Sequence, residues 1–372
     1  MRILVVGGGI AGCAVALAAH RAGLDAEVYE ARADGGDDGA FLTLASNGMA
    51  ALAQLDAAHA VGAAGFPLIA LRLSDATGTE IACRPLDGHA GPLTRFRCLR
   101  RAGLCDVLRA EVHRRGVPIR FGARLVAVAE DDTGVTARFA DGTGARGDLL
   151  VGADGLRSAV RAAIDPACPP PRYAGQRVYY GYTRRAAPPT APGRIDMIRG
   201  GTVAFGYAVS PAGETFWYAR VPGRALDPAE DLTPARCRET LLPLLRPDDT
   251  AAADIVAGTG DELMVTDARD LPAVPRWYTG RSLVVGDAAH AASPATGQGA
   301  SMAIEDAVVL GKALRDAATT GAALAAYDRV RRPRVEANVA ASARLTAGRP
   351  ADRPRADTGP AHLDWHTPLP TG

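Results

Sequence analysis

Several features that direct proteins to particular partners or compartments are scarce or missing in this chain of 372 residues. Its 42 basic and 41 acidic residues leave a net charge of +1, which offers no electrostatic footprint for nucleic acid. No window holds 18 uninterrupted apolar residues, so the sequence predicts no membrane-spanning helix. Lysine is almost absent, since Lys312 is the one example, and we attribute this to genomic codon bias rather than to chemistry.

Cysteine is also used sparingly. The six cysteines form no C-x-x-C pair and no zinc-type spacing with the seven histidines. The sequence therefore predicts no metal site, and it indicates a reduced protein of the cytoplasm.

The chain can form large hydrophobic cores, because 48% of its residues are hydrophobic. Its length is typical of a protein with two domains. A glycine motif stands at the start. Gly7, Gly9 and Gly12 follow the apolar run 3–6 and open a helix-forming segment, 11–22. A strand, a tight turn and a helix in this order are typical of a dinucleotide site, where backbone N–H groups meet a pyrophosphate.

An acidic residue stands where such a site needs one. Glu30 ends a second predicted strand, 26–29, and comes 18 residues after Gly12. A carboxylate at this place can accept hydrogen bonds from both hydroxyls of an adenosine ribose. The N-terminus also resembles a secretory signal, but cleavage would destroy the glycine motif, so we reject that interpretation.

Two further glycine motifs follow predicted strands. Gly152-Ala153-Asp154-Gly155 comes after 149–151, and Gly286-Asp287 comes after 282–285. The second continues into a loop with Pro294 and Gly297 and then into a helix that begins near Gly299. Three such motifs in this order indicate one extended cofactor.

Aromatic residues gather in one region. Nine of them lie between Tyr173 and Tyr218, and several are paired at i and i+2, where strand residues share a face. One interpretation is an ordinary sheet core, and the other is the wall of a pocket for a planar ligand. The candidate pocket residues are Tyr180, Tyr182, Phe205, Tyr207, Phe216 and Tyr218.

Taken together, the motifs resemble those of the FAD-dependent aromatic hydroxylases related to para-hydroxybenzoate hydroxylase. The resemblance rests on the three glycine motifs with Glu30, on Arg101-Ala102-Gly103-Leu104 at the start of a helix, and on Pro294-x-x-Gly297-Gln298-Gly299. One departure is Ala291, where many relatives have proline. Another is the loop Gly35 to Gly39, a variable version of the family's segment near the isoalloxazine.

The resemblance implies an α/β fold with a Rossmann-like FAD-binding domain and a second, β-sheet substrate domain. The FAD-binding domain would be discontinuous, comprising residues 1–70, 100–165 and 276–348. The substrate domain would comprise 71–99 and 166–275. Residues 349–372 are expected to form a loosely packed C-terminal extension.

The resemblance also implies roles for individual residues. The first glycine motif, including Ile10 and Ala11, would bind the pyrophosphate, with Glu30 and Arg32 at the adenosine end and Arg101 along the ribityl–pyrophosphate. Asp154 would close the nucleotide site and would also contribute to the access of the nicotinamide cofactor. Gly286 and Asp287 would hold the ribityl chain. Catalysis would need no conventional acid or base: Pro294 and Gly297 would face the flavin, and the helix start at Gln298 and Gly299 would stabilise the reduced flavin anion. His290 is interpreted as a structural, hydrogen-bonded residue.

The activity implied is a single-component monooxygenase with noncovalent FAD. NADPH or NADH would reduce the flavin transiently, and a C4a-hydroperoxyflavin formed with O2 would oxidise an aromatic or polycyclic small molecule. Dehydrogenation, epoxidation and Baeyer–Villiger oxidation on the same fold stay open as alternatives, as does a non-catalytic flavin-binding accessory protein. We expect a monomer or a homodimer.

Overall fold

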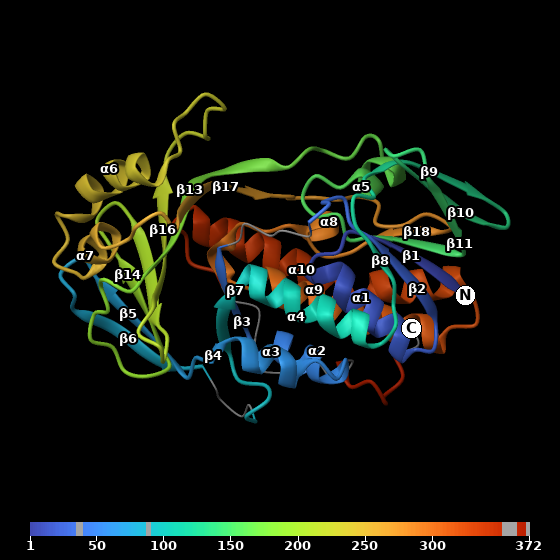
Figure 1. Ribbon diagram of the computed structural model, residues 1–372, viewed down its shortest axis with the longest axis horizontal. Coiled ribbons are helices and arrows are strands. Elements are labelled where there is room, and N and C mark those ends of the chain that lie inside the picture. Colours follow the sequence, from blue (N-terminus) through green and yellow to red (C-terminus); the bar gives the residue numbers. More distant parts are fainter. Residues whose placement is uncertain (35–39, 87–90, 352–362, 370–372) are drawn as a thin grey trace.

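The computed structural model describes residues 1–34, 40–86, 91–351 and 363–369. Two β-sheets lie at opposite ends of the molecule, with long helices between and beneath them (Figure 1). The loop Gly35 to Gly39, expected near the isoalloxazine, lies outside the described residues.

A five-stranded parallel sheet forms the centre of the first domain. Strands β1 and β12 pair in register from Ile3 and Leu149 to Val6 and Gly152. Residues 3–6 are all at most 3% exposed, because both faces of the sheet are covered: helices pack on one face, and a small antiparallel sheet of residues 125–147 packs on the other. In order across the sheet, the strands are β18 (Ser282–Val284), β12 (Leu149–Gly152), β1 (Arg2–Val6), β2 (Asp25–Tyr29) and β8 (Ile119–Arg120).

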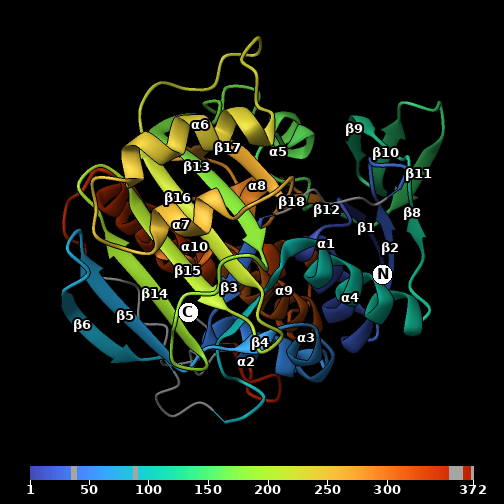
Figure 2. The same ribbon diagram turned by 60° about the vertical axis from the view of Figure 1, so that its left-hand side comes forward.

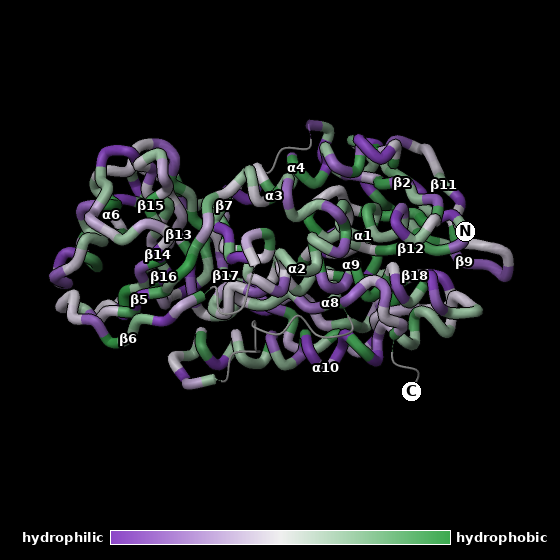
Figure 3. Tube along the Cα trace, turned by 90° about the horizontal axis from the view of Figure 1, so that it is seen from below, coloured by the Kyte–Doolittle hydropathy of each residue, from purple (hydrophilic) through white to green (hydrophobic). Residues whose placement is uncertain are grey.

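The helices of this domain begin close to the glycine motifs. Helix α1 starts directly after Gly9, and α9 starts at Gly299, as the sequence predicts. Helix α10 runs along one side of the molecule and alternates between hydrophobic and hydrophilic residues (Figure 3). Its buried residues, among them Leu324, Tyr327 and Val335, recur every three or four positions. The helices are α1 (Ile10–Arg21), α2 (Ser46–Gln54), α3 (Ala58–Ala64), α4 (Arg101–Arg114), α5 (Ala159–Ile164), α8 (Asp287–His290), α9 (Gly299–Asp316) and α10 (Thr320–Thr346).

Two small sheets complete the domain. One is an antiparallel hairpin with a third strand, and the other joins the segment before α2 to the segment before α4. The first contains β9 (Leu125–Asp131), β10 (Gly134–Phe139) and β11 (Gly144–Gly147). The second contains β3 (Phe41–Leu44), β7 (Arg97–Arg100) and β4 (Phe66–Pro67).

A seven-stranded sheet forms the second domain. Helices α6 (Pro234–Leu245) and α7 (Ala252–Ala257) cover one of its faces (Figure 2). The strands in order are β17 (Leu263–Asp270), β13 (Arg172–Thr183), β16 (Thr215–Pro222), β15 (Ala204–Val209), β14 (Arg194–Arg199), β5 (Ala70–Asp75) and β6 (Glu80–Pro85). The predicted α/β fold with a second β-sheet domain is confirmed.

The C-terminal segment differs from the expected loose extension where it is described. Trp365 is 5% exposed and lies between the guanidinium groups of Arg21 and Arg315, at 5.0 and 5.2 Å from its ring centroid. The Lys312 ammonium donates to the Asp364 carbonyl over 2.6 Å. Residues 363–369 therefore pack against α1 and α9. Among the described helices, none is both long and apolar enough to cross a membrane.

Candidate active site

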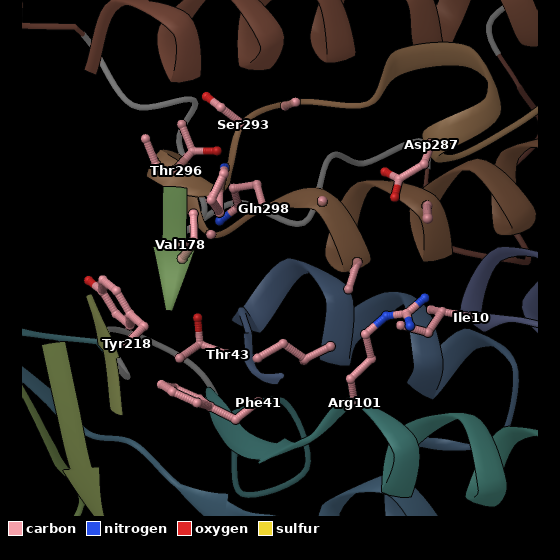
Figure 4. Close-up of a pocket in the computed structure, with 18 of the residues that line it drawn as sticks. Ile10, Phe41, Thr43, Arg101, Val178, Tyr218, Asp287, Ser293, Thr296 and Gln298 are labelled. Atoms are coloured by element: carbon pink, nitrogen blue, oxygen red, sulfur yellow. The ribbon is translucent and has the colours of Figure 1, made fainter. Parts of the chain in front are cut away.

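A cavity of about 610 Å³ lies between the glycine motifs and the seven-stranded sheet. Its lining includes Gly9 to Ala11 and Asp287 at one end and strands β13, β14 and β16 at the other, with residues 292–300 along one side. Figure 4 shows Arg101, Ile10 and Asp287 at the first end and Tyr218 at the second, with Phe41 and Thr43 between them. Both groups of sequence-predicted residues therefore contribute to one cavity.

The first glycine motif needs glycine for steric reasons. Gly7 has a φ of +106°, and a Cβ there would lie 2.4 Å from the Ala153 carbonyl oxygen. A Cβ at Gly12 would lie 1.8 Å from the carbonyl oxygen of Gly7. At Gly9, by contrast, a Cβ would meet no atom within 4 Å, so the backbone at the start of α1 is open to the cavity.

Glu30 lies at the end of β2, beside this motif. Its Oε2 atom accepts a hydrogen bond from the Gly8 N–H over 2.6 Å, and its Oε1 accepts from the Arg32 N–H over 2.9 Å. The structure thus brings Glu30 to the glycine turn.

Arg109 also contacts the turn, although the sequence analysis did not single it out. Its Nε donates to the carbonyl oxygen of Gly8 over 2.9 Å. Arg109 lies two i+4 steps after Arg101 on α4, so the helical spacing from the Arg101 motif could have indicated it.

The second and third motifs adopt different arrangements. The Asp154 carboxylate accepts hydrogen bonds from Ser158 Oγ over 2.5 Å and from the N–H groups of Ala159 and Val160, at the start of α5. Desolvation by burial raises the pKa of Asp154. The side chain implied to close the nucleotide site is therefore engaged with α5, whereas its neighbours Ala153 and Gly155 line the cavity.

Gly286 and Asp287 lie at the meeting point of three helix N-termini. Gly286 has a φ of +57°, and a Cβ there would lie 2.9 Å from Ala11 Cβ on α1 and 3.2 Å from Ala303 Cβ on α9. Asp287, the first residue of α8, is exposed to the cavity. The free N–H groups and dipoles of helix N-termini favour an anionic ligand.

The loop before α9 forms the wall between the two ends. Pro294 to Thr296 form a short 3₁₀ helix, and Gly297 has a left-handed φ of +66°. Pro294, Gly297, Gln298 and Gly299 all line the cavity.

A buried polar network lies behind this loop. Asn47 Nδ2 donates to Gln298 Oε1 over 3.1 Å and to Glu305 Oε1 over 2.7 Å. Arg331 pairs with Glu305 over 2.5 Å and with Asp306 over 2.8 Å. Burial alone would raise the pKa of both acids, but the charges of Arg331 and, for Asp306, of His290 hold each pKa at about 2.

His290 belongs to this network. Its Nε2 lies 2.6 Å from Asp306 Oδ2, and the residue is 4% exposed and outside the cavity lining. The contacts fit the structural interpretation of His290.

The six aromatic candidates separate into three pairs. Tyr180 and Tyr218 line the cavity. Tyr182 and Phe216 lie on the same sheet face, but they are buried under Phe41, and Phe216 also contacts Phe66.

The third pair faces away from the cavity. Phe205 pairs across the sheet with Ala219, and Tyr207 pairs with Trp217. Residues paired across strands share a face, and Trp217 alternates with Tyr218, so Phe205 and Tyr207 point to the opposite side. There they pack in the core that includes Trp217 and residues of α6 and α7.

Several other lining residues carry no sequence signal that singles them out. Leu71, Ile195 and Met197 add an aliphatic wall, and Phe41 and Thr43 enter from β3. Arg220 could have been found, because it follows Tyr218 at i+2 on β16.

Comparison with known proteins identifies the family. The family model of an FAD binding domain matches residues 1–342. The chain belongs to the FAD-dependent aromatic monooxygenases. The resemblance to the para-hydroxybenzoate hydroxylase family is thereby confirmed.

Three relatives illustrate the range of this monooxygenase family. Aurachin C monooxygenase/isomerase from Stigmatella aurantiaca is 33% identical over 350 residues, which cover 93% of this chain and 88% of the relative. A 3-amino-4-hydroxybenzoate 2-monooxygenase from Streptomyces platensis is 34% identical over 351 residues, covering 90% and 85%. The structure of Klebsiella pneumoniae HpxO complexed with FAD and uric acid matches with a TM-score of 0.84 and 29% identity, covering 94% of this chain and 89% of that one.

Proposed function

We propose that this FAD-dependent monooxygenase consumes NADPH or NADH and inserts one oxygen atom of O2 into an aromatic or polycyclic small molecule. The observation that carries the proposal is the single cavity, which joins the helix N-termini of a dinucleotide site to an apolar wall with two tyrosines. When bound, FAD supplies the chemistry that accepts a hydride and activates O2.

The residues fit FAD on steric and electrostatic grounds. Gly9 leaves the start of α1 open, and the N-termini of α1, α8 and α9 offer N–H groups to negative charge. Glu30 and Arg32 would hold the adenosine end, Arg101 the phosphates and Asp287 the ribityl hydroxyls. Helix α9, through Gln298 and Gly299, would stabilise negative charge on the reduced ring system.

The substrate would lie against the seven-stranded sheet. Tyr180 and Tyr218 offer flat rings, and the aliphatic side chains beside them exclude water, which protects reactive oxygen chemistry. The related proteins support an aromatic substrate, since their names include enzymes acting on urate and on an aminohydroxybenzoate.

The test combines oxygen uptake with product mass. Purified holoprotein should consume O2 and NAD(P)H faster when a suitable aromatic compound is added, and the product should gain one oxygen atom. A product that has lost two hydrogens would indicate dehydrogenation instead. Flavin binding with neither NAD(P)H oxidation nor a product, over a broad aromatic panel, would indicate a binding protein.

A further inference from the structure

Arg220 places a positive charge at the sheet end of the cavity. It lies on β16, opposite Val178 of β13, and both residues line the cavity. The other charged lining residues that the structure describes are Arg101 and Asp287, which lie at the dinucleotide end (Figure 4). Among the described lining residues, Arg220 is thus the positively charged one that lies next to Tyr180, Tyr218 and the aliphatic side chains.

No described residue accepts a hydrogen bond from Arg220. The guanidinium of Arg220 contacts the Tyr218 ring, and Arg220 Cζ lies 5.9 Å from the centroid of that ring. Its Nε is buried without a hydrogen-bond partner among the described residues. Two other arginines of this sheet are fully engaged: Arg172 binds the Asp270 carboxylate through two atoms, and Arg177 binds Glu230 in the same way.

Such an arrangement is costly in the absence of a ligand. A guanidinium is always charged in proteins, and a buried polar group without a partner destabilises the fold. Its planar fork matches a carboxylate, which can accept two of its hydrogen bonds at once.

The neighbouring tyrosine supports an acidic ligand. Desolvation in the cavity wall raises the pKa of Tyr180 to about 12, so its hydroxyl stays a neutral hydrogen-bond donor. The one described carboxylate in the lining, Asp287, belongs to the dinucleotide end and does not compete for this site.

We propose that Arg220 determines substrate specificity by binding the carboxylate of an aromatic acid. The aliphatic residues Leu71, Ile195 and Met197 would contact the apolar body of the same molecule. This inference rests on the proposed function, because it names the substrate class of the same cavity.

The test compares ligands that differ only in charge. Holoprotein is titrated with benzoate and benzamide, and with a naphthoate and its amide, and binding is followed by the flavin absorbance and by equilibrium dialysis. Wild-type protein should bind at least one acid about 10- to 100-fold more tightly than its amide. Arg220→Gln should abolish this preference and leave amide affinity unchanged, whereas Arg220→Lys should keep part of it.

Arg236→Gln is the matched control. Arg236 lies on α6, on the far side of the sheet, and its side chain is 62% exposed. This variant should keep the wild-type preference, and all variants should keep their FAD content.

Three results would overturn the assignment: no preference for acids in the wild type, no acid bound at all, or equal weakening of acid and amide by Arg220→Gln. Loss of FAD from Arg220→Gln would also overturn it, because Arg220 would then serve the cofactor. Oxygenation of a neutral aromatic without a preference for acids would leave the proposed function intact, whereas failure to bind flavin would refute both.

Discussion

The Nε2 atom of His290 lies 2.6 Å from Oδ2 of Asp306, and the same oxygen accepts a hydrogen bond from the Gly286 N–H over 2.9 Å. Asp306 therefore connects the third glycine motif to helix α9 from beneath the cavity. Its other oxygen accepts from Arg331 of α10 over 2.8 Å. One buried carboxylate thus fixes the position of three segments around the cofactor end.

Replacing Asp306 by Asn should strongly destabilise the protein. The variant removes one of the two buried carboxylates that pair with Arg331, so that Glu305 must balance both Arg331 and Arg334 and one positive charge loses its partner. An uncompensated buried charge typically costs about 3–5 kcal/mol. Urea unfolding of the holoprotein measures the change. Asp316→Asn, on the same helix but 30% exposed, should cost less than about 1 kcal/mol. Equal effects of the two substitutions would refute a structural role for the network.

The network also predicts a dependence of stability on pH. The folded-state pKa values of Glu305 and Asp306 are about 2, whereas unfolded acids titrate near pH ~4. Because folding depresses these pKa values, their stabilisation is complete above about pH 5 and is lost as the pH falls toward about 2. Unfolding free energies measured across this window should decrease on acidification, and the decrease should be smaller in Asp306→Asn. An identical pH profile in the variant would contradict the prediction.

Asp287→Ala should weaken FAD binding by roughly 1–3 kcal/mol, the range for a lost hydrogen bond to a charged group. Its carboxylate is exposed to the cavity at the start of α8, where ribityl hydroxyls are expected. Fluorescence titration of apoprotein with FAD measures the affinity. Asp141→Ala, in an exposed turn of the small sheet, is the control. Unchanged affinity in Asp287→Ala would mean that the carboxylate does not contact the cofactor.

Tyr218→Ala and Phe205→Ala should have different effects. Tyr218 lines the cavity, so its loss should weaken substrate binding about tenfold or more at nearly unchanged FAD content. Phe205 is 1% exposed and stacks on Trp217 at 5.5 Å, so its loss should cost about 3–5 kcal/mol of stability without changing substrate preference. Substrate titrations of both variants measure the change in substrate affinity, and urea unfolding measures the change in stability. A shift of substrate preference in Phe205→Ala alone would reverse the assignment of faces.

Much of the cofactor end could be predicted because its constraints are local. The steric demand on Gly12 comes from Gly7 within the same turn, and a strand followed by glycine and a helix is visible in the sequence. The close approach of Ala153 to Gly7 is a long-range contact that the sequence does not reveal. The face of each aromatic pair depends on strand register, which the sequence does not reveal. Phe205 and Tyr207 share the spacing of Tyr180 and Tyr182 yet lie on the other side of the sheet.

Long-range packing accounts for the remaining differences. Arg331 is one of several arginines in α10, and its burial depends on Glu305 and Asp306, which α9 places beside it. Trp365 packs between two arginines from α1 and α9, so a segment without periodicity still joins the core.

The most direct test of a monooxygenase is the origin of the oxygen in its product. The holoprotein, NAD(P)H and an aromatic substrate are incubated under isotopically labelled O2, and the product is analysed by mass spectrometry. The account predicts that the product carries one labelled oxygen atom and that labelled water alone gives none. Product that takes its oxygen from water, or that forms equally well without NAD(P)H, would contradict it.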